Sequence, residues 1–429
     1  MKITGYRDAK FNPAAFGSSP GARPIPKKIM TAAEKIFDDV AARGDAALYE
    51  WTAKLEKHRI TAGTVKVSAQ ELRRAYQAVP VEDLKVIKLA AKRIKAYHKL
   101  QVPQGFRYCD SQGSVIAERV LPLERVGLCI PGGRALASTV LMTALPAQLA
   151  GVKEIIMINP WPEGRGNAHV LAAAKLMGVS AVYKIGGVQG VAALACGTAS
   201  MPRVDKIVGP GSIWVTAAKA IAVARGLCGI DSLAGPSEVA VVADQSAYPG
   251  CVAVDLLSQA EHGQDSVSIL ICTSMALIQK VRGELERLVR GRNSAWPRQV
   301  LDRISAVEVK DLDMAAELVN RIAPEHLEII VKDPAGLVAK IRNAASIFIG
   351  PYSPVPVGDY MAGGNHVLPT GGAARFSSPL SVRDFVKRQS VTELSRETLA
   401  AIVKPTARFA EIEGLPAHAL AVRKRFEHE

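Results

Sequence analysis

The feature that most constrains the fold is a regular alternation of short apolar runs and helical segments that begins near residue 124. The apolar runs are rich in Val and Ile and end at Gly, Pro or polar residues, which is typical of buried strands. Alternation of this length predicts a parallel, doubly wound sheet. The predicted strands are 124–130, 154–158, 181–185, 204–208 and 238–243, and the predicted helices are 137–150, 167–177, 188–197 and 213–225.

A second stretch of the same character follows. It predicts a helix over 250–262, a strand over 267–272, a helix to about 290, a strand near 304–309 and a helix over 311–321, with further strands at 327–331 and 346–349. Two such stretches suggest a pair of related α/β domains, although no sequence repeat is evident.

Helical patterns flank the two stretches. Residues 26–100 look helical, with a capping box from Ser68 to Glu71 and a helix that restarts after Pro80. The chain after Val382 also looks helical, with a second capping-box pattern from Ser390 to Glu393. Because Pro405, Gly414 and Pro416 divide this tail into short helices, it cannot form one compact core. It must pack on its own body or on a partner.

Composition narrows the class of protein. The net charge is +14, but the most basic helix, 81–100, lacks interleaved aromatic residues, so a solvated face is favoured over nucleic-acid binding. No membrane-length apolar run and no signal-peptide core are present, which predicts a cytoplasmic protein without a membrane partner. The six cysteines form no C-x-x-C pair and are expected to be reduced.

The turns that follow the predicted strands are rich in Gly and Pro, at 131–133, 186–187 and 209–211. Ligands of open α/β sheets bind at such turns, where helix N-termini suit phosphates. No G-x-G-x-x-G motif occurs in the chain, so these turns alone do not identify a dinucleotide site.

Polar residues gather at three places. Asp255, Gln259 and His262 share one face of the predicted 250–262 helix, which suits either solvation or metal ligation. The turn-rich stretch 350–370 forms neither a clean helix nor a clean strand, and it places Asp359 and His366 in a pocket wall or a surface loop.

Glu325 and His326 are neighbours at a helix-to-strand turn. Adjacent residues in extended structure point to opposite sides, so we expect the two to have different partners. The pair suits two separate proton transfers, or a capping His beside a surface Glu.

The segments SQAEHG, APEHLE, VGDYMAGGNHVLPT, GPSEV, DKIVGPG and EGLPAHALAVRKR occur in the order and spacing of histidinol dehydrogenases, and essentially the whole chain resembles that family. The resemblance implies an α/β fold of two related, incomplete Rossmann-like domains with parallel-rich sheets. It adds a helical N-terminal segment and a helical C-terminal arm that packs on a partner subunit. The implied divisions are an N-terminal arm (1–25), a first α/β domain with the metal and catalytic motifs (26–125 and 238–380), a cofactor-side domain (126–237) and the C-terminal arm (381–429).

The resemblance also implies site residues. One zinc ion per subunit would be held by Gln259, His262 and Asp359, with His418 supplied by the other subunit. Glu325 and His326 match the acid–base pair. The positions implied in substrate binding are Ser237, Gln259, His262, His326, Asp359, His366, Glu413 and His418. The cofactor positions are Cys129, Gln189 and Ser212, where the family pattern has Tyr at the first and Asn at the last.

The implied activity is the oxidation of L-histidinol through L-histidinaldehyde to L-histidine by a homodimer, with two NAD reduced. Two alternatives stay open at this point. One is a related dehydrogenase of another amino alcohol or diol, which the changes at Cys129 and Ser212 favour. The other is a binding protein that retains zinc and substrate but not turnover.

Overall fold

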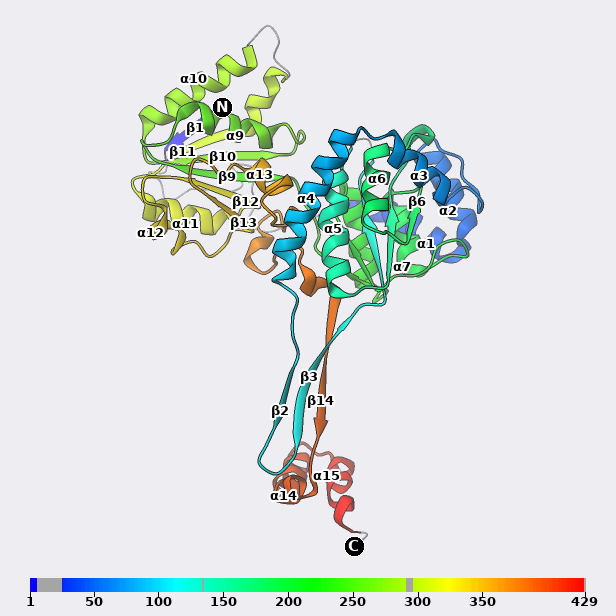
Figure 1. Cartoon of the computed structure of the whole chain (residues 1–429). Coiled ribbons are helices and arrows are strands. Elements are labelled where there is room, and N and C mark those ends of the chain that lie inside the picture. The colour runs from blue at the N-terminus through cyan, green and yellow to red at the C-terminus, as the bar shows by residue number, and fades with distance from the viewer. Residues whose placement is uncertain (6–24, 133–134, 291–295, 428–429) are drawn as a thin grey trace. The chain divides into compact units, whose positions relative to one another are not determined.

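A computed structural model of the 429-residue chain describes residues 1–5, 25–132, 135–290 and 296–427. The chain divides into two compact units, residues 1–102 with 123–385 and residues 103–122 with 386–429 (Figure 1). Residues 6–24 of the predicted N-terminal arm lie outside the described residues. No described helix is long and apolar enough to cross a membrane.

The larger unit contains a six-stranded parallel sheet of order β1-β11-β10-β9-β12-β13. Helices α9 (Pro249–Ala260) and α10 (Met275–Arg290) cover one face, and α11 (Leu312–Ile322) and α12 (Pro334–Val338) cover the other (Figure 1). The strands are β1 (Lys2–Gly5), β9 (Glu238–Ala243), β10 (Val267–Cys272), β11 (Ile304–Glu308), β12 (His326–Ile330) and β13 (Ser346–Ile349). Strand β1 was not predicted from the sequence.

The same unit contains a five-stranded parallel sheet of order β6-β5-β4-β7-β8. Its strands are β4 (Arg125–Cys129), β5 (Glu154–Ile158), β6 (Ala181–Tyr183), β7 (Lys206–Val208) and β8 (Gly229–Ile230). One face packs on α3 (Ala69–Ala78), α4 (Val81–Lys99), α5 (Ala137–Ala150) and α6 (Ala168–Leu176). The other packs on α1 (Lys27–Arg43), α2 (Asp45–Leu55), α7 (Gly187–Cys196) and α8 (Ile213–Ala224).

Apart from β1, the two sheets have the same strand order. In each, the first strand lies at the centre, two later strands extend to one side and two more to the other. This order confirms the prediction of two related Rossmann-like α/β units. The sequence grouping placed 26–125 with 238–380, whereas the buried residues of the N-terminal helices, such as Phe37 and Ile94, pack in the two cores of the five-stranded sheet.

Helix signals near the N-terminus are confirmed. The Glu71 N–H donates to Ser68 Oγ over 3.1 Å, and the Ser68 N–H donates to Glu71 Oε2 over 2.7 Å, which completes the capping box of α3. Pro80 is the N-cap of α4. The buried residues Ile87, Ala91 and Ile94 form its apolar stripe.

The smaller unit corrects the helical prediction for the tail. Residues Val386–Glu393 form strand β14, which pairs antiparallel with β3 (Val115–Pro122), and β3 pairs with β2 (Phe106–Cys109) (Figure 1). Ser390 therefore lies in a strand opposite Glu118, and the predicted capping box there is wrong. This segment contains β-branched residues, which favour strands, and it pairs with β3 along its whole length. The pairing overrides the local helix signal.

Two helices complete this unit, α14 (Arg396–Ile412) and α15 (Pro416–Arg423). The N-cap of α14 is Ser395, whose side chain accepts from the Thr398 N–H. Pro405 lies inside α14 and does not end it, which is a second correction. Gly414 has a φ of 72°, which favours glycine, and it separates the two helices as predicted.

Candidate functional site

The backbone of Glu238, the first residue of β9, joins the two predicted proton-transfer residues. Its N–H donates to Glu325 Oε2 over 2.9 Å, and its carbonyl oxygen lies 3.0 Å from His326 Nδ1. We expected Glu325 and His326 to have different partners, and this expectation is wrong, because both side chains contact the backbone of the same residue, Glu238. Glu325 precedes β12 and is not part of the extended strand, so its side chain turns toward the same neighbour as that of His326.

The bond to a carbonyl oxygen fixes the tautomer of His326. A carbonyl only accepts, so Nδ1 carries the hydrogen and Nε2 carries the lone pair. Burial lowers the pKa of His326 to about 4, against the opposing effect of the Glu238 carbonyl, so the ring is neutral at neutral pH. Its Nε2 is buried and has no hydrogen-bond partner among the described residues. His326 therefore presents a free proton acceptor.

A short helix, α13 (Val355–Tyr360), brings Asp359 to this acceptor. Asp359 Oδ1 lies 3.9 Å from His326 Nε2, and burial raises the pKa of Asp359 to about 6. A helix here corrects the expectation that 350–370 contains none. Its close approach to β13 requires Gly358, because a Cβ at that position would overlap the ring of Phe348.

His366 comes from the same turn-rich segment as Asp359. Its Nδ1 is 3.0 Å from the Asp359 carbonyl oxygen, and its Nε2 is 3.3 Å from Thr139 Oγ1 of α5. Burial lowers the pKa of His366 to about 4. Together His326, Asp359 and His366 line a cavity of about 360 Å³, whose wall also contains Phe348 and Gly358.

Gln259 and His262 come from the end of α9. Gln259 is only 2% exposed, and its Nε2 has no hydrogen-bond partner in the described part of the chain. Helix α9 ends at Ala260, so His262 lies beyond the helix that was predicted to contain it. The charge of His262 contributes to lowering the pKa values of His326 and His366, so it lies near both rings.

No three His, Cys, Asp or Glu side chains of the described residues lie close enough together to hold a metal ion. Of the four predicted ligands, only His262 and Asp359 are of these types and lie in the larger unit. Gln259 is an amide, and His418 lies in the smaller unit.

This site lies at an unusual edge of its sheet. Glu238 and His326 are the first residues of β9 and β12, so they mark the amino ends of these parallel strands. Ligands of doubly wound sheets usually bind at the carboxyl ends. The candidate cofactor residues of the five-stranded sheet follow the usual rule, since Cys129 ends β4 and Ser212 follows β7.

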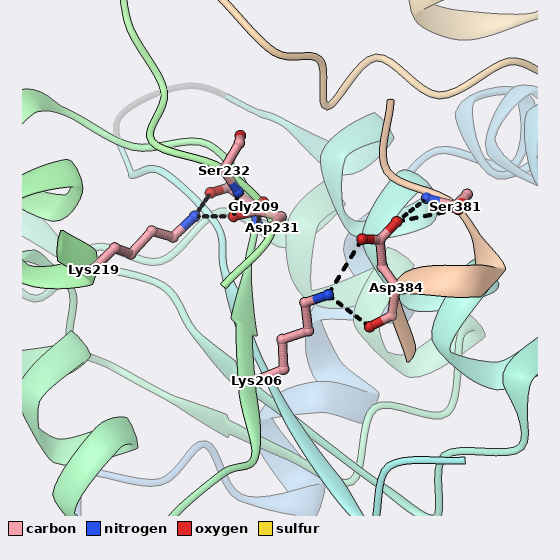
Figure 2. A network of polar contacts seen from close by, with 7 residues as sticks. All are labelled: Lys206, Gly209, Lys219, Asp231, Ser232, Ser381 and Asp384. Atoms are coloured by element: carbon pink, nitrogen blue, oxygen red, sulfur yellow. Dashed lines mark hydrogen bonds and ion pairs between the residues drawn. The ribbon is translucent and has the colours of Figure 1, made fainter. Parts of the chain in front are cut away.

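The carboxyl edge of the five-stranded sheet is held by a buried ion pair. Figure 2 shows Lys219 of α8 beside Asp231, with Nζ donating to Asp231 Oδ1 over 2.7 Å and to the Gly209 carbonyl oxygen over 2.6 Å. The Gly209 N–H donates to Asp231 Oδ2 over 2.7 Å. Gly209 has a φ of 109° and no room for a Cβ against the Cys129 carbonyl. The network therefore fixes the turn between β7 and α8.

The structure shows the burial and contacts of the three predicted cofactor residues, Cys129, Ser212 and Gln189. Cys129 is 3% exposed, and burial raises the pKa of its thiol to about 12, so it remains a neutral thiol. Ser212 is the N-cap residue of α8. Gln189 is buried in α7, where its Nε2 donates to Glu56 Oε1 over 2.9 Å.

The remaining predicted residues lie in two places. Ser237 directly precedes β9, and its carbonyl oxygen accepts from the Val267 N–H over 3.0 Å. Glu413 and His418 are exposed in the smaller unit, where both line an open groove of about 880 Å³. Apolar side chains such as Phe409 and Leu415 form much of the groove.

Comparisons with known proteins agree over the whole chain. A family profile for histidinol dehydrogenase matches residues 23–426. The chain belongs to the histidinol dehydrogenase family. The histidinol dehydrogenase of Syntrophotalea carbinolica is 44% identical over 432 residues, covering 100% of this chain and 99% of that protein. That of Methylococcus capsulatus is 47% identical over 398 residues, covering 92% and 91%.

A solved structure of the family has the same fold. The crystal structure of histidinol dehydrogenase from Elizabethkingia anophelis matches with a TM-score of 0.92 and 34% sequence identity, covering 100% of this chain and 98% of that one. Membership of the family makes the protein an oxidoreductase.

Sequence reasoning missed several residues that organise the site. The backbone of Glu238 orients both proton-transfer residues, and Thr139 reaches His366 from α5, which packs on the five-stranded sheet. Glu238 lies in the GPSEV segment, so its motif was visible although its role was not. Nothing in the local sequence marks Thr139.

Proposed function

We propose that the protein is a histidinol dehydrogenase that oxidises L-histidinol through L-histidinaldehyde to L-histidine in the cytoplasm, using two NAD and one zinc ion per subunit. The observation that carries the proposal is the neutral His326, whose unpartnered Nε2 meets Asp359 in a cavity also lined by His366. A base of this kind suits removal of a proton from an alcohol.

The donor types fit a zinc ion. Gln259 and Asp359 supply oxygen, and His262 and a second subunit's copy of His418 supply nitrogen, which is an acceptable set for this borderline ion. The buried, unpartnered amide nitrogen of Gln259 supports the fit, because amide oxygen and nitrogen are assigned from their hydrogen bonds and a flip places the oxygen there. When bound, zinc would orient the imidazole and amino groups of the substrate, and NAD would accept a hydride in each oxidation.

The protein's own groups account for the proton transfers. In the first oxidation, His326 Nε2 accepts the hydroxyl proton, while Nδ1 stays bonded to the Glu238 carbonyl oxygen. In the second, Glu325 accepts a proton from the water that adds to the aldehyde. Burial raises the pKa of Glu325 well above its usual range, helped by the charges of Glu238 and Asp359, so its ionised form is a stronger base than an exposed carboxylate.

The groove of the smaller unit supports a shared active site. Phe409, which lines the groove, is 65% exposed, and Ile412 at the end of the same helix is 68% exposed, an unusual exposure for large apolar side chains. Burial of this surface against a second copy of the chain would also carry Glu413 and His418 into that copy's site. We therefore place His418 with the Gln259, His262 and Asp359 of its partner in a homodimer.

One assay tests the proposal directly. The purified protein should produce two NADH for each L-histidinol consumed, and a chelator should abolish this activity until zinc or a similar divalent ion is restored. Absorbance at the NADH band and quantification of L-histidine measure the yield. Full turnover by a preparation shown to be metal-free would contradict the zinc assignment, and no turnover by the zinc-loaded protein would contradict the activity itself.

A further inference from the structure

A pair of carboxyl groups, Asp255 and Glu328, is not part of the wall of the cavity. Glu328 is 1% exposed on β12, two residues after His326, so the two side chains lie on the same face of the sheet. Its Oε1 accepts from the Val355 N–H, at the start of α13, over 2.6 Å. Its Oε2 is buried without a hydrogen-bond donor among the described residues.

The second carboxyl group belongs to Asp255 of α9, one turn before Gln259, and its side chain hydrogen-bonds to that of Glu328. Two ionised carboxylates cannot form such a bond, because both only accept. Burial raises the pKa of Glu328 to about 8, helped by the charge of Asp255, and burial raises the pKa of Asp255 to about 6. Near neutral pH the pair therefore shares one proton, and an O–H···O bond joins the two side chains.

We propose that Asp255 and Glu328 are positioning residues, and that their shared-proton bond holds α9, β12 and α13 in the arrangement that brings Gln259, His326 and Asp359 together. Each of these elements carries one of the three site residues, and each is bonded to the pair or contains one of its members. The inference rests on the proposed function for the roles of the three site residues.

Among the described residues, no other charged group contributes to the pKa shifts of the pair. The strand neighbours of Glu328 are Val241 on β9 and Phe348 on β13, and α13 presents the Val355 amide. The pKa of Glu328 is shifted only by burial, Asp255 and Val355, and that of Asp255 only by burial and Glu328. A neutral amide at residue 328 should therefore replace the protonated carboxyl group.

Two variants at Glu328 test whether its hydrogen bonds position the site residues, because one variant keeps the bonds and the other loses them. In Glu328→Gln, the amide oxygen accepts from Val355 and the amide nitrogen donates to Asp255, so zinc affinity and turnover should stay within about threefold of wild type. Glu328→Ala loses both bonds and leaves Asp255 charged and buried. Zinc affinity, measured by chelator competition with the metal alone, should fall about 10–100-fold, as for other residues that orient metal ligands.

Asp244→Ala is the matched control. Asp244 follows β9 at the opposite edge of the same sheet, where its carboxylate accepts from the Lys332 N–H over 2.9 Å after β12. Its loss removes a backbone-to-carboxylate hydrogen bond that joins the ends of β9 and β12, instead of β12 and α13, and should leave zinc affinity unchanged. Wild-type zinc affinity in a folded Glu328→Ala variant would overturn the proposal. Equal losses in Glu328→Gln and Glu328→Ala would also overturn it.

The proton shared by Asp255 and Glu328 can be tested by a second measurement, the pH dependence of the melting temperature. This measurement does not require Glu328→Ala to fold. A carboxyl group with a raised folded-state pKa stabilises the fold at low pH and loses this contribution as pH rises through the folded-state value. The melting temperature of the metal-free wild type should therefore fall between about pH 5 and pH 8 more steeply than that of Glu328→Gln. Parallel pH profiles would contradict the shared proton. If the wild type fails to oxidise histidinol, the proposed function fails, and the zinc and melting data still decide the pair.

Discussion

Replacing His326 with Asn lowers the rate of histidinol oxidation by about 10²–10⁴-fold, the usual contribution of a general base. The substitution removes the Nε2 lone pair, which is buried, neutral at neutral pH and unpartnered among the described residues. An Asn amide can still bond to the Glu238 carbonyl oxygen, so the loss should appear in turnover with little change in zinc content. Stopped-flow NADH production measures the rate, and elemental analysis measures the metal.

Glu325→Gln provides the comparison, because it should separate the two oxidations. The amide can no longer accept a proton from water, but His326 remains able to start the first step. Histidinaldehyde oxidation should therefore slow far more than histidinol oxidation when each is assayed alone. Equal slowing of both would show that the two residues do not divide the proton transfers in this way.

Dimers that mix Asp359→Ala and His418→Ala subunits should recover activity, although each variant alone is inactive. In a mixed dimer, one site collects both defects, while the other combines an intact Asp359 with an intact His418 from the opposite chain. Random exchange puts half of the dimers in mixed form with one working site each, so about a quarter of wild-type activity should return.

The control is a mixture of Asp359→Ala with His262→Ala, whose residues lie in the same unit of the chain. Both defects then fall in the body of the chain, so no site in the mixed dimer is intact and no activity should return. Mass spectrometry establishes that mixed dimers have formed in both cases. Absence of recovery with His418→Ala, despite mixed dimers, would place His418 in the site of its own chain.

Inner strands of the parallel sheets were predictable because they are buried on both faces. Predicted strands 154–158, 238–243 and 267–272 coincide with β5, β9 and β10, since uninterrupted apolar runs leave little choice of structure. Strands β2 and β14 have mostly exposed residues, so they carry no such run. Their pairing with β3 is a property of distant segments, which a local pattern does not contain.

The site shows the same division. His326 and Asp359 were identifiable from their motifs, but their geometry depends on contacts between residues far apart in the sequence. The carbonyl group that fixes the His326 tautomer belongs to Glu238, 88 residues earlier. The role of Glu328 depends on Val355 and Asp255, which lie on two other elements. The sequence showed which types of side chain form the site, whereas their protonation states depend on contacts that only the folded structure shows.

The pairing of β1 with β11 has a consequence for how the protein is made. Lys2 lies opposite Ser305, so strand β1 finds its partner only after the distant segment that contains Ser305 has been synthesised. The five strands from Arg125 to Ile230, in contrast, are contiguous in sequence. Long loops delay strand pairing, so we expect the five-stranded sheet to form first. In pulse-labelled refolding, its amides should gain hydrogen-exchange protection before those of β1 and β11; the reverse order would show that the edge of the six-stranded sheet assembles early.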